Sequence, residues 1–302
     1  MSKDTSHSDS RTIHLPTFSL LIFLFLASLS CFNLALAQEA ESVPNASLNG
    51  RGRMECPDCL NNESETSQLL QMADALYADF KPKEALGVFL KVLDIDPQNH
   101  EALAKTARVY IDFGDAIPES TPDFSDKRLE HYLISEQYAR KAVKANPAWT
   151  WGHFFVAASL GKISLESSVS KQIDLAHEIR AEVDKAIALD PQNGFAYHIL
   201  GIWNRRLAEI GLMSRFLAQT ILWRSVPKGS FEKSEEYLKK ALSINPDVIN
   251  HHLELAKTYV AMGKWNLARR YLRSIEDLPI HYSDDQNHKE KARRLLQEIK
   301  DR

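Results

Sequence analysis

Four similar phrases recur along the middle of the chain, and each contains an acidic or amide residue followed by proline. They are LKVLDIDPQN, RKAVKANPAW, DKAIALDPQN and KKALSINPDV, with prolines at positions 97, 147, 191 and 246. Because proline lacks an N–H and disfavours helix in the residue before it, each phrase predicts a helix end and a turn. Alanine stands five residues before three of the prolines, and Val92 stands there in the first phrase. The repetition therefore predicts an array of similar helical units.

A second apolar-periodic segment precedes each phrase, so the repeating unit is a pair of helices. These segments are 69–80, 102–113, 149–160, 195–210 and 253–262. One such pair cannot bury its apolar face alone, whereas stacked pairs share a continuous core. We therefore predict an all-α fold. Its architecture is an α-solenoid, or superhelix, of about five tetratricopeptide-like helix pairs over residues 66–302, closed by a charged C-terminal capping helix.

The spacing of the repeats predicts insertions within the helix pairs. Successive prolines lie 50, 44 and 55 residues apart, which exceeds the 34 residues of a tetratricopeptide unit. The longest insertion, residues 211–230, contains Phe216, Ile221 and Trp223 on a mostly apolar surface. A long insertion in a compact unit is usually functional. We predict that it is a lid packed on the solenoid; a membrane-surface helix is the alternative.

Residues 1–37 have the composition of a targeting segment. Lys3 and Arg11 precede an uncharged apolar run, Leu15 to Ala37, that ends in the sequence Ala-Leu-Ala. This pattern predicts a signal peptide cleaved after Ala37, and hence a periplasmic or secreted protein. The run is also long enough to span about 30 Å of hydrocarbon as an uncleaved membrane anchor. Membrane contact is expected only through residues 15–37 in that case.

Residues 38–65 are polar, lack a helical or strand period, and predict a flexible linker. The linker contains the sequence Cys56-Pro-Asp-Cys59. One C-x-x-C without a second pair cannot close a tetrahedral zinc site, so a local disulfide is favoured and an inert thiol pair is the alternative. Residues 66–302 contain no cysteine, and the fold therefore needs no disulfide there. We expect no cofactor and no metal.

The first helix of each pair in a solenoid lines its concave face. The repeat register predicts that the following residues face a partner there: Arg108, Trp151, Phe154, Phe195, His198, Arg205, Asn250 and Lys257. Aromatic and cationic side chains together suit a peptide with apolar anchors and a carboxylate. We predict a non-catalytic scaffold that binds a peptide or protein. Core packing of the aromatics and solvation of the cations are the alternatives.

Two other classes of function fit the sequence less well. The net charge of −3 argues against nucleic acid as a partner, because phosphate binding needs an excess of Lys and Arg. A hydrolase subunit with a histidine site is a further alternative, since seven histidines lie between residues 153 and 288. Their spacing matches no metal-binding motif, so buried or surface histidines explain them better.

Three phrases carry a more specific resemblance. NPAWTWGHFFVAASLG (146–161), ALDPQNGFAYHILGIWNRRLAEI (188–210) and LELAKTYVAMGKWNLARRYL (253–272) make residues 66–302 similar to the regulator of microtubule dynamics family. The resemblance implies a helical scaffold associated with microtubules, without catalysis, often held on the cytoplasmic face of an organelle membrane by an N-terminal apolar segment. Export would separate the chain from tubulin, and a bacterial member would keep the fold without that partner.

Overall fold

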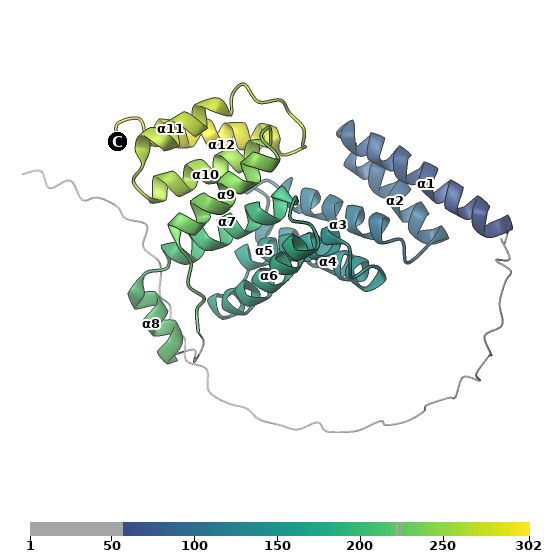
Figure 1. Ribbon diagram of the computed structural model, residues 1–302, viewed down its shortest axis with the longest axis horizontal. Helices are drawn as coiled ribbons and strands as arrows, with labels where there is room; N and C mark the ends of the chain where they lie inside the picture. The colour runs from purple at the N-terminus through teal and green to yellow at the C-terminus, as the bar shows by residue number, and fades with distance from the viewer. Residues whose placement is uncertain (1–56, 222, 224) are drawn as a thin grey trace, which may run out of the picture. The chain divides into compact units, whose positions relative to one another are not determined.

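The computed structural model describes residues 57–221, 223 and 225–302, which belong to one compact unit of twelve α-helices (Figure 1). The first six are α1 (Pro57–Ala78), α2 (Pro82–Ile95), α3 (His100–Asp115), α4 (Phe124–Ala145), α5 (Thr150–Leu165) and α6 (Val169–Leu189). The others are α7 (Gly194–Glu209), α8 (Leu212–Ile221), α9 (Phe231–Ile244), α10 (Ile249–Ala261), α11 (Trp265–Ser274) and α12 (Asp285–Glu298).

The helices pack as consecutive pairs. Each pair joins a first and a second helix: α1 with α2, α3 with α4, α5 with α6, α7 with α9, and α10 with α11. The first helices of neighbouring pairs also touch one another, along the series α3, α5, α7 and α10, and α12 packs on α10 at the end of the series. Because these contacts link one pair to the next, the pairs form a continuous stack. The prediction of an all-α array of five pairs with a C-terminal capping helix is confirmed.

The repeated proline phrases form the joints between pairs. In each, the residue before proline donates its N–H to the carbonyl four residues earlier, which belongs to Val92, Ala142, Ala186 or Ala241. Those four side chains are fully buried. In two of the phrases an asparagine then caps the next helix: Asn99 accepts the N–H of Ala102, and Asn193 that of Ala196, both at 3.0 Å. One phrase therefore closes a helix and begins the following one.

The N-terminal boundary differs from the sequence expectation. Helix α1 begins at Pro57, so residues 57–65 continue the first helix instead of belonging to a flexible linker. Proline is compatible with the first turn of a helix, so a helix can begin at Pro57. The predicted targeting segment (1–37), Cys56 and the side chain of Cys59 lie outside the described residues. Among the described helices, none combines the length and the apolar character needed to cross a bilayer.

The long insertion contains α8, which lies apart from the stacked pairs (Figure 1). It makes no extended packing contact with any other described helix. Phe216, Ile221 and Trp223 are exposed. The prediction that this insertion packs as a lid on the solenoid is wrong, because its apolar side chains point into solvent.

Candidate binding surface

Aromatic rings from three first helices meet on one side of the stack. We call this side the inner face and define it as the surface formed by α3, α5, α7 and α10. The ring of Trp151 lies 5.4 Å from that of Phe154, and Phe154 lies 6.0 Å from Phe195. Phe195 in turn lies 5.2 Å from the ring of His251. Phe154 is only 9% exposed, whereas Trp151 and Phe195 are half-buried and retain accessible surface.

The loop between α11 and α12 lies against this inner face. The Tyr282 ring is 6.0 Å from the Phe195 ring and 5.4 Å from the Arg108 guanidinium. The same guanidinium lies 4.0 Å from the ring centroid of Tyr77 on α1. Arg108 thus makes cation–π contacts with two tyrosines that are far apart in sequence. Part of the surface predicted to bind a partner is occupied by the C-terminal segment of the chain itself.

The two cations predicted from α7 and α10 share one carboxylate. Glu254 is 6% exposed, and its Oε2 and Oε1 accept from Arg205 Nη2 at 2.5 Å and from Lys257 Nζ at 2.6 Å. Burial alone would raise the pKa of Glu254, but Lys257 and Arg205 outweigh it and hold that pKa far below its usual range. Arg205 is itself buried and also pairs with Glu209 at 3.0 Å. Arg205 is therefore an internal ion-pair partner rather than an open charge.

His198 is stacked on a second buried histidine. Its Nδ1 lies 3.1 Å from Nδ1 of His251, and the ring centroids are 4.7 Å apart. One of the two must donate and the other accept, so the contact requires at least one neutral ring. Burial lowers the pKa of His198 to about 4 against the opposing effect of Glu254. Burial and the neighbouring His198 lower the pKa of His251 to about 2. Both rings are neutral at pH 7.

We expect this histidine pair to weaken the fold in acid. The pKa of His198 lies below its usual value of 6.5 in the folded state, so the unfolded chain binds more protons between pH 6.5 and about 4. The stability contributed by the neutral pair is complete above pH 6.5 and is lost as pH falls. Each histidine lowers the free energy of unfolding by at most about 1.4 kcal/mol for every unit by which the pH falls in this range. Urea unfolding of the wild type and of His198→Asn at pH 7 and pH 5 measures it.

Asp112 should affect the pH dependence of stability in the opposite direction, and it therefore serves as a control. Burial raises its pKa to about 6, while a hydrogen bond from Tyr77 and the charge of Arg108 oppose that shift. The contribution of Asp112 to the stability of the fold therefore falls as pH rises from about 4 to 6. The wild type should lose more stability between pH 7 and pH 5 than His198→Asn, and Asp112→Asn should lose more than the wild type. Equal losses in all three proteins would contradict the assignment.

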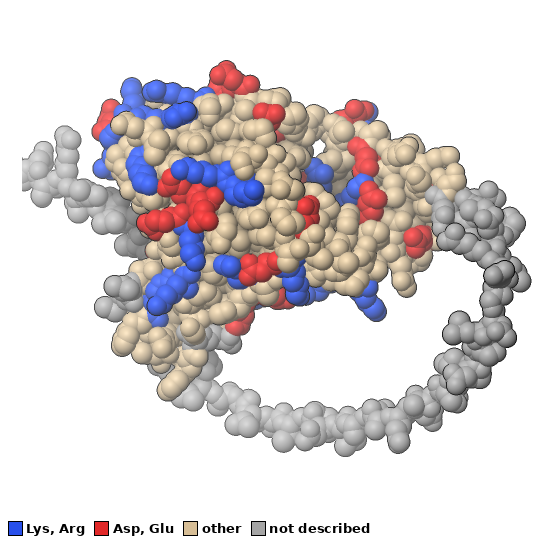
Figure 2. All heavy atoms as spheres, viewed as in Figure 1, with Lys and Arg blue, Asp and Glu red and all other residues tan. Residues whose placement is uncertain are grey.

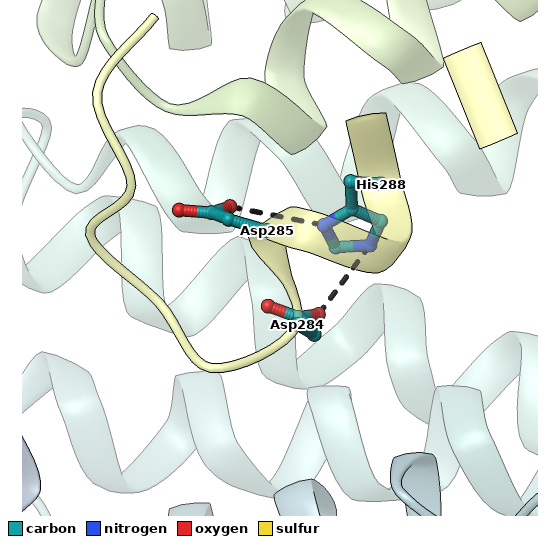
Figure 3. Close-up of side chains that lie close together, drawn as sticks. All are labelled: Asp284, Asp285 and His288. Atoms are coloured by element: carbon teal, nitrogen blue, oxygen red, sulfur yellow. Dashed lines mark ion pairs between the residues drawn. The ribbon is translucent and has the colours of Figure 1, made fainter. Parts of the chain in front are cut away.

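A third cluster begins α12 (Figure 3). His288 Nε2 lies 3.3 Å from Asp284 Oδ2, and His288 Nδ1 lies 3.9 Å from Asp285 Oδ1. Asp285 Oδ2 also accepts the N–H groups of His281 and Tyr282 at 2.8 and 2.9 Å. The two carboxylates face different ring nitrogens in these contacts, whereas the ligands of one metal ion would converge with a single ring nitrogen on one point. The cluster holds the Tyr282 loop and gives no support to a histidine-site hydrolase.

Several of these residues could not be found from the repeat register. Tyr282 lies in a loop outside the repeat, and Tyr77 and His251 were not among the predicted positions. Glu254 had one available signal, since it stands three residues before Lys257 and such pairs meet on a helix. Asn250 is half-buried on α10 and belongs neither to the ring cluster nor to the Glu254 ion pairs.

Positive and negative side chains are interspersed over the face seen in Figure 2. Glu235, for example, accepts from Lys239 at 2.6 Å and from Lys264 at 2.8 Å. Neither sign of charge dominates this face of the described residues. Its electrostatics therefore favour mutual ion pairing over the long stripe of cations that a nucleic acid would require.

Comparison with known proteins gives a consistent result. The family described as regulator of microtubule dynamics protein 1-3 matches residues 69–300. Regulator of microtubule dynamics protein 1 of Bos taurus is 25% identical over 239 residues, covering 79% of this chain and 73% of that protein. The Pongo abelii protein of the same name is 26% identical over 247 residues, covering 77% of each chain. A thermophilic tetratricopeptide-repeat protein of Thermus thermophilus superimposes with a TM-score of 0.55 at 17% identity, covering 77% of this chain and 99% of that one. The last likeness establishes the fold alone.

Proposed function

This chain belongs to the regulator of microtubule dynamics protein 1-3 family, and from that premise we propose that it is a non-catalytic interaction scaffold. Its inner face binds an extended segment of a partner protein. The preferred segment carries an aromatic anchor beside Trp151 and Phe195 and acidic residues near Arg108. The tetratricopeptide-like fold supports this proposal, since stacked helix pairs present a long surface to extended ligands.

The observation that carries the proposal is the position of the Tyr282 loop. Its sequence, PIHYSDDQ (279–286), contains one aromatic residue followed by two carboxylates. The ring of Tyr282 already lies against Phe195 and Arg108, at 6.0 and 5.4 Å. Tyr282 therefore serves as an internal example of the aromatic side chain that the inner face accepts. A partner segment of the same kind would compete with it.

Removing the Tyr282 ring should open this position to a free peptide. A tethered segment competes at an effective concentration of about 1 mM, so the wild type should exclude a weakly binding peptide. We expect Tyr282→Ala to bind a labelled PIHYSDDQ peptide roughly tenfold more tightly than the wild type does. Fluorescence anisotropy measures both affinities. Ile280→Ala, which changes an exposed side chain of the same loop, is the matched control and should behave as the wild type.

The role of the inner face in binding is tested in the Tyr282→Ala variant. Adding Arg108→Ala to Tyr282→Ala removes the cation–π contact, worth about 1 kcal/mol, and should weaken the peptide about fivefold. A peptide with alanine in place of its tyrosine should lose binding to a similar extent. If Tyr282→Ala fails to bind the peptide, or binds it equally without Arg108, the inner face is not the binding surface.

Microtubules are the second candidate partner, and family membership is the observation that favours them. Co-sedimentation of the purified protein with taxol-stabilised microtubules tests this directly. Enrichment in the pellet above a tubulin-free control would support a microtubule regulator. A competing effect of the PIHYSDDQ peptide on pelleting would place the tubulin contact on the inner face, and the absence of enrichment would remove this candidate.

We further propose that residues 15–37 decide where the scaffold works. Cleavage after Ala37 would release an exported protein, whereas retention would hold the helix pairs close to a membrane. N-terminal sequencing of the mature protein distinguishes the two. A first residue of Gln38 supports export, and an intact N-terminus supports anchoring.

A further inference from the structure

Helix α8 presents its apolar side chains outward. Phe216 is 62% exposed, Ile221 is 60% exposed and Trp223, just beyond the helix, is 89% exposed. Ala218, on another side of the helix, is buried. At 3.6 residues per turn, Phe216, Leu217 and Ile221 fall on one continuous arc, and Ala218 falls outside it. This arrangement is the reverse of an ordinary surface helix, whose apolar arc faces the core.

Arg215 fixes the helix in this orientation. Its guanidinium donates to the carbonyl oxygens of Ile210 at 3.2 Å, Val226 at 3.3 Å and Pro227 at 2.8 Å, and also to that of Leu207. Those carbonyls lie at both ends of the insertion, so one side chain ties α8 to its base. The outward direction of the apolar arc is thus specified by hydrogen bonds.

The charges of the insertion have one sign. Residues 210–231 contain Arg215, Arg224 and Lys228 but no aspartate or glutamate, although the whole chain has 40 acidic residues against 37 lysines and arginines. The region of α8, at the lower left of Figure 2, is accordingly free of red atoms. An apolar arc with a tryptophan at its edge and cations nearby has the composition of helices that lie in the interface of an anionic bilayer.

The small size of the exposed apolar surface on α8 favours a membrane over a protein as its binding partner. A specific protein interface uses about 20–30 residues from each side. Here the exposed apolar surface consists of one ten-residue helix and one neighbouring tryptophan. Such a helix is about 15 Å long, too short to cross a bilayer but sufficient to lie in its interface. A lipid surface needs no complementary shape, so this small arc suffices.

We propose that α8 and Trp223 form a docking element that lies in the interface of a membrane containing anionic phospholipids. Phe216, Leu217, Ile221 and Trp223 enter the boundary between headgroups and acyl chains, while the exposed Lys228 faces the phosphates. The contact is separate from the inner face and from the apolar segment 15–37. It would orient the stack of helix pairs relative to the membrane plane.

Tryptophan fluorescence of the full-length protein can test this contact selectively. Trp223 is the one tryptophan with a largely exposed ring, because the other four are half-buried and none lies in residues 1–37. Insertion of the N-terminal segment therefore contributes no tryptophan signal of its own. The protein is added to vesicles of brominated phosphatidylcholine with phosphatidylserine, and the bromine-dependent quenching is measured.

We expect at least threefold less quenching in Trp223→Phe, and a comparable loss in Phe216→Ser combined with Ile221→Ser. Val169→Ser, which removes an exposed apolar side chain from α6, is the matched control and should leave quenching unchanged. Omitting phosphatidylserine or adding 0.5 M NaCl, a test concentration at which the Debye length is only about 4 Å, should reduce quenching.

Three results would overturn the proposal. Quenching in Trp223→Phe equal to that of the wild type would mean that Trp223 does not meet lipid. Equal quenching with and without phosphatidylserine would exclude selection by anionic headgroups. A concentration-dependent blue shift of Trp223 emission without vesicles would assign the apolar arc to a second copy of the chain.

Discussion

Replacing Glu254 with glutamine is expected to destabilise the protein by about 3 kcal/mol, because it leaves a buried charge without its partner. Glutamine keeps the shape of the side chain but removes the negative charge between Arg205 and Lys257. The guanidinium of Arg205, itself 9% exposed, would then remain in a low-dielectric site without its principal counter-ion. Urea unfolding at pH 7, followed by circular dichroism, measures the loss.

Glu209→Gln is the matched control, since Glu209 pairs with the same guanidinium at 3.0 Å but is exposed. Its replacement should cost below about 1 kcal/mol, because water screens the pair. Removing both buried charges, in Glu254→Leu with Arg205→Leu, should recover part of the stability lost by Glu254→Gln. Losses of similar size for Glu254→Gln and Glu209→Gln would show that burial does not determine the energy of this network.

This network also marks the limit of what the sequence could predict about the inner face. The rings of Trp151, Phe154 and Phe195, which the repeat register places on first helices, lie close together, because side chains of first helices recur with the period of the repeat. The register could not indicate that Arg205 pairs with Glu254, since Glu254 lies 49 residues away and meets it only through the contact of α7 with α10. Burial of a charge depends on the neighbouring pair, and the sequence of one helix does not contain that information.

The array of helix pairs was easier to predict than the surface segments, because the signals for the array are local in the sequence. Each proline phrase encodes a helix end, a turn and the next start within about ten residues, so local chemistry alone sets the number of pairs. The Tyr282 loop and α8 lie outside the repeated units. Their positions depend on contacts between residues that are not neighbours in sequence, namely Tyr282 with Phe195 and Arg215 with the carbonyl of Pro227. Local patterns therefore gave the array but not the two segments that modify its surfaces.

The close approach of helices within a pair leads to a second large effect, at Gly201. A Cβ atom added there would lie 2.4 Å from Cγ of Leu238, the branching carbon of a fully buried side chain on α9. Leu238 is fully buried, so Gly201→Ala should separate α7 from α9. We expect a loss of about 2 kcal/mol, within the range for an overpacked core.

Gly161 supplies a control, because the same substitution there should change the stability in the opposite direction. It also lies within a helix, α5, but a Cβ added there would have no atom within 4 Å. Gly161→Ala should therefore stabilise the protein by about 0.5–1 kcal/mol, because alanine favours helix where nothing is crowded. Thermal unfolding of the two variants beside the wild type should move the midpoint in opposite directions. The substitution is glycine to alanine at both positions, so only the surroundings differ. A gain in stability at both would mean that the added methyl group fits between α7 and α9. The close packing of these helices would then not depend on a glycine at position 201.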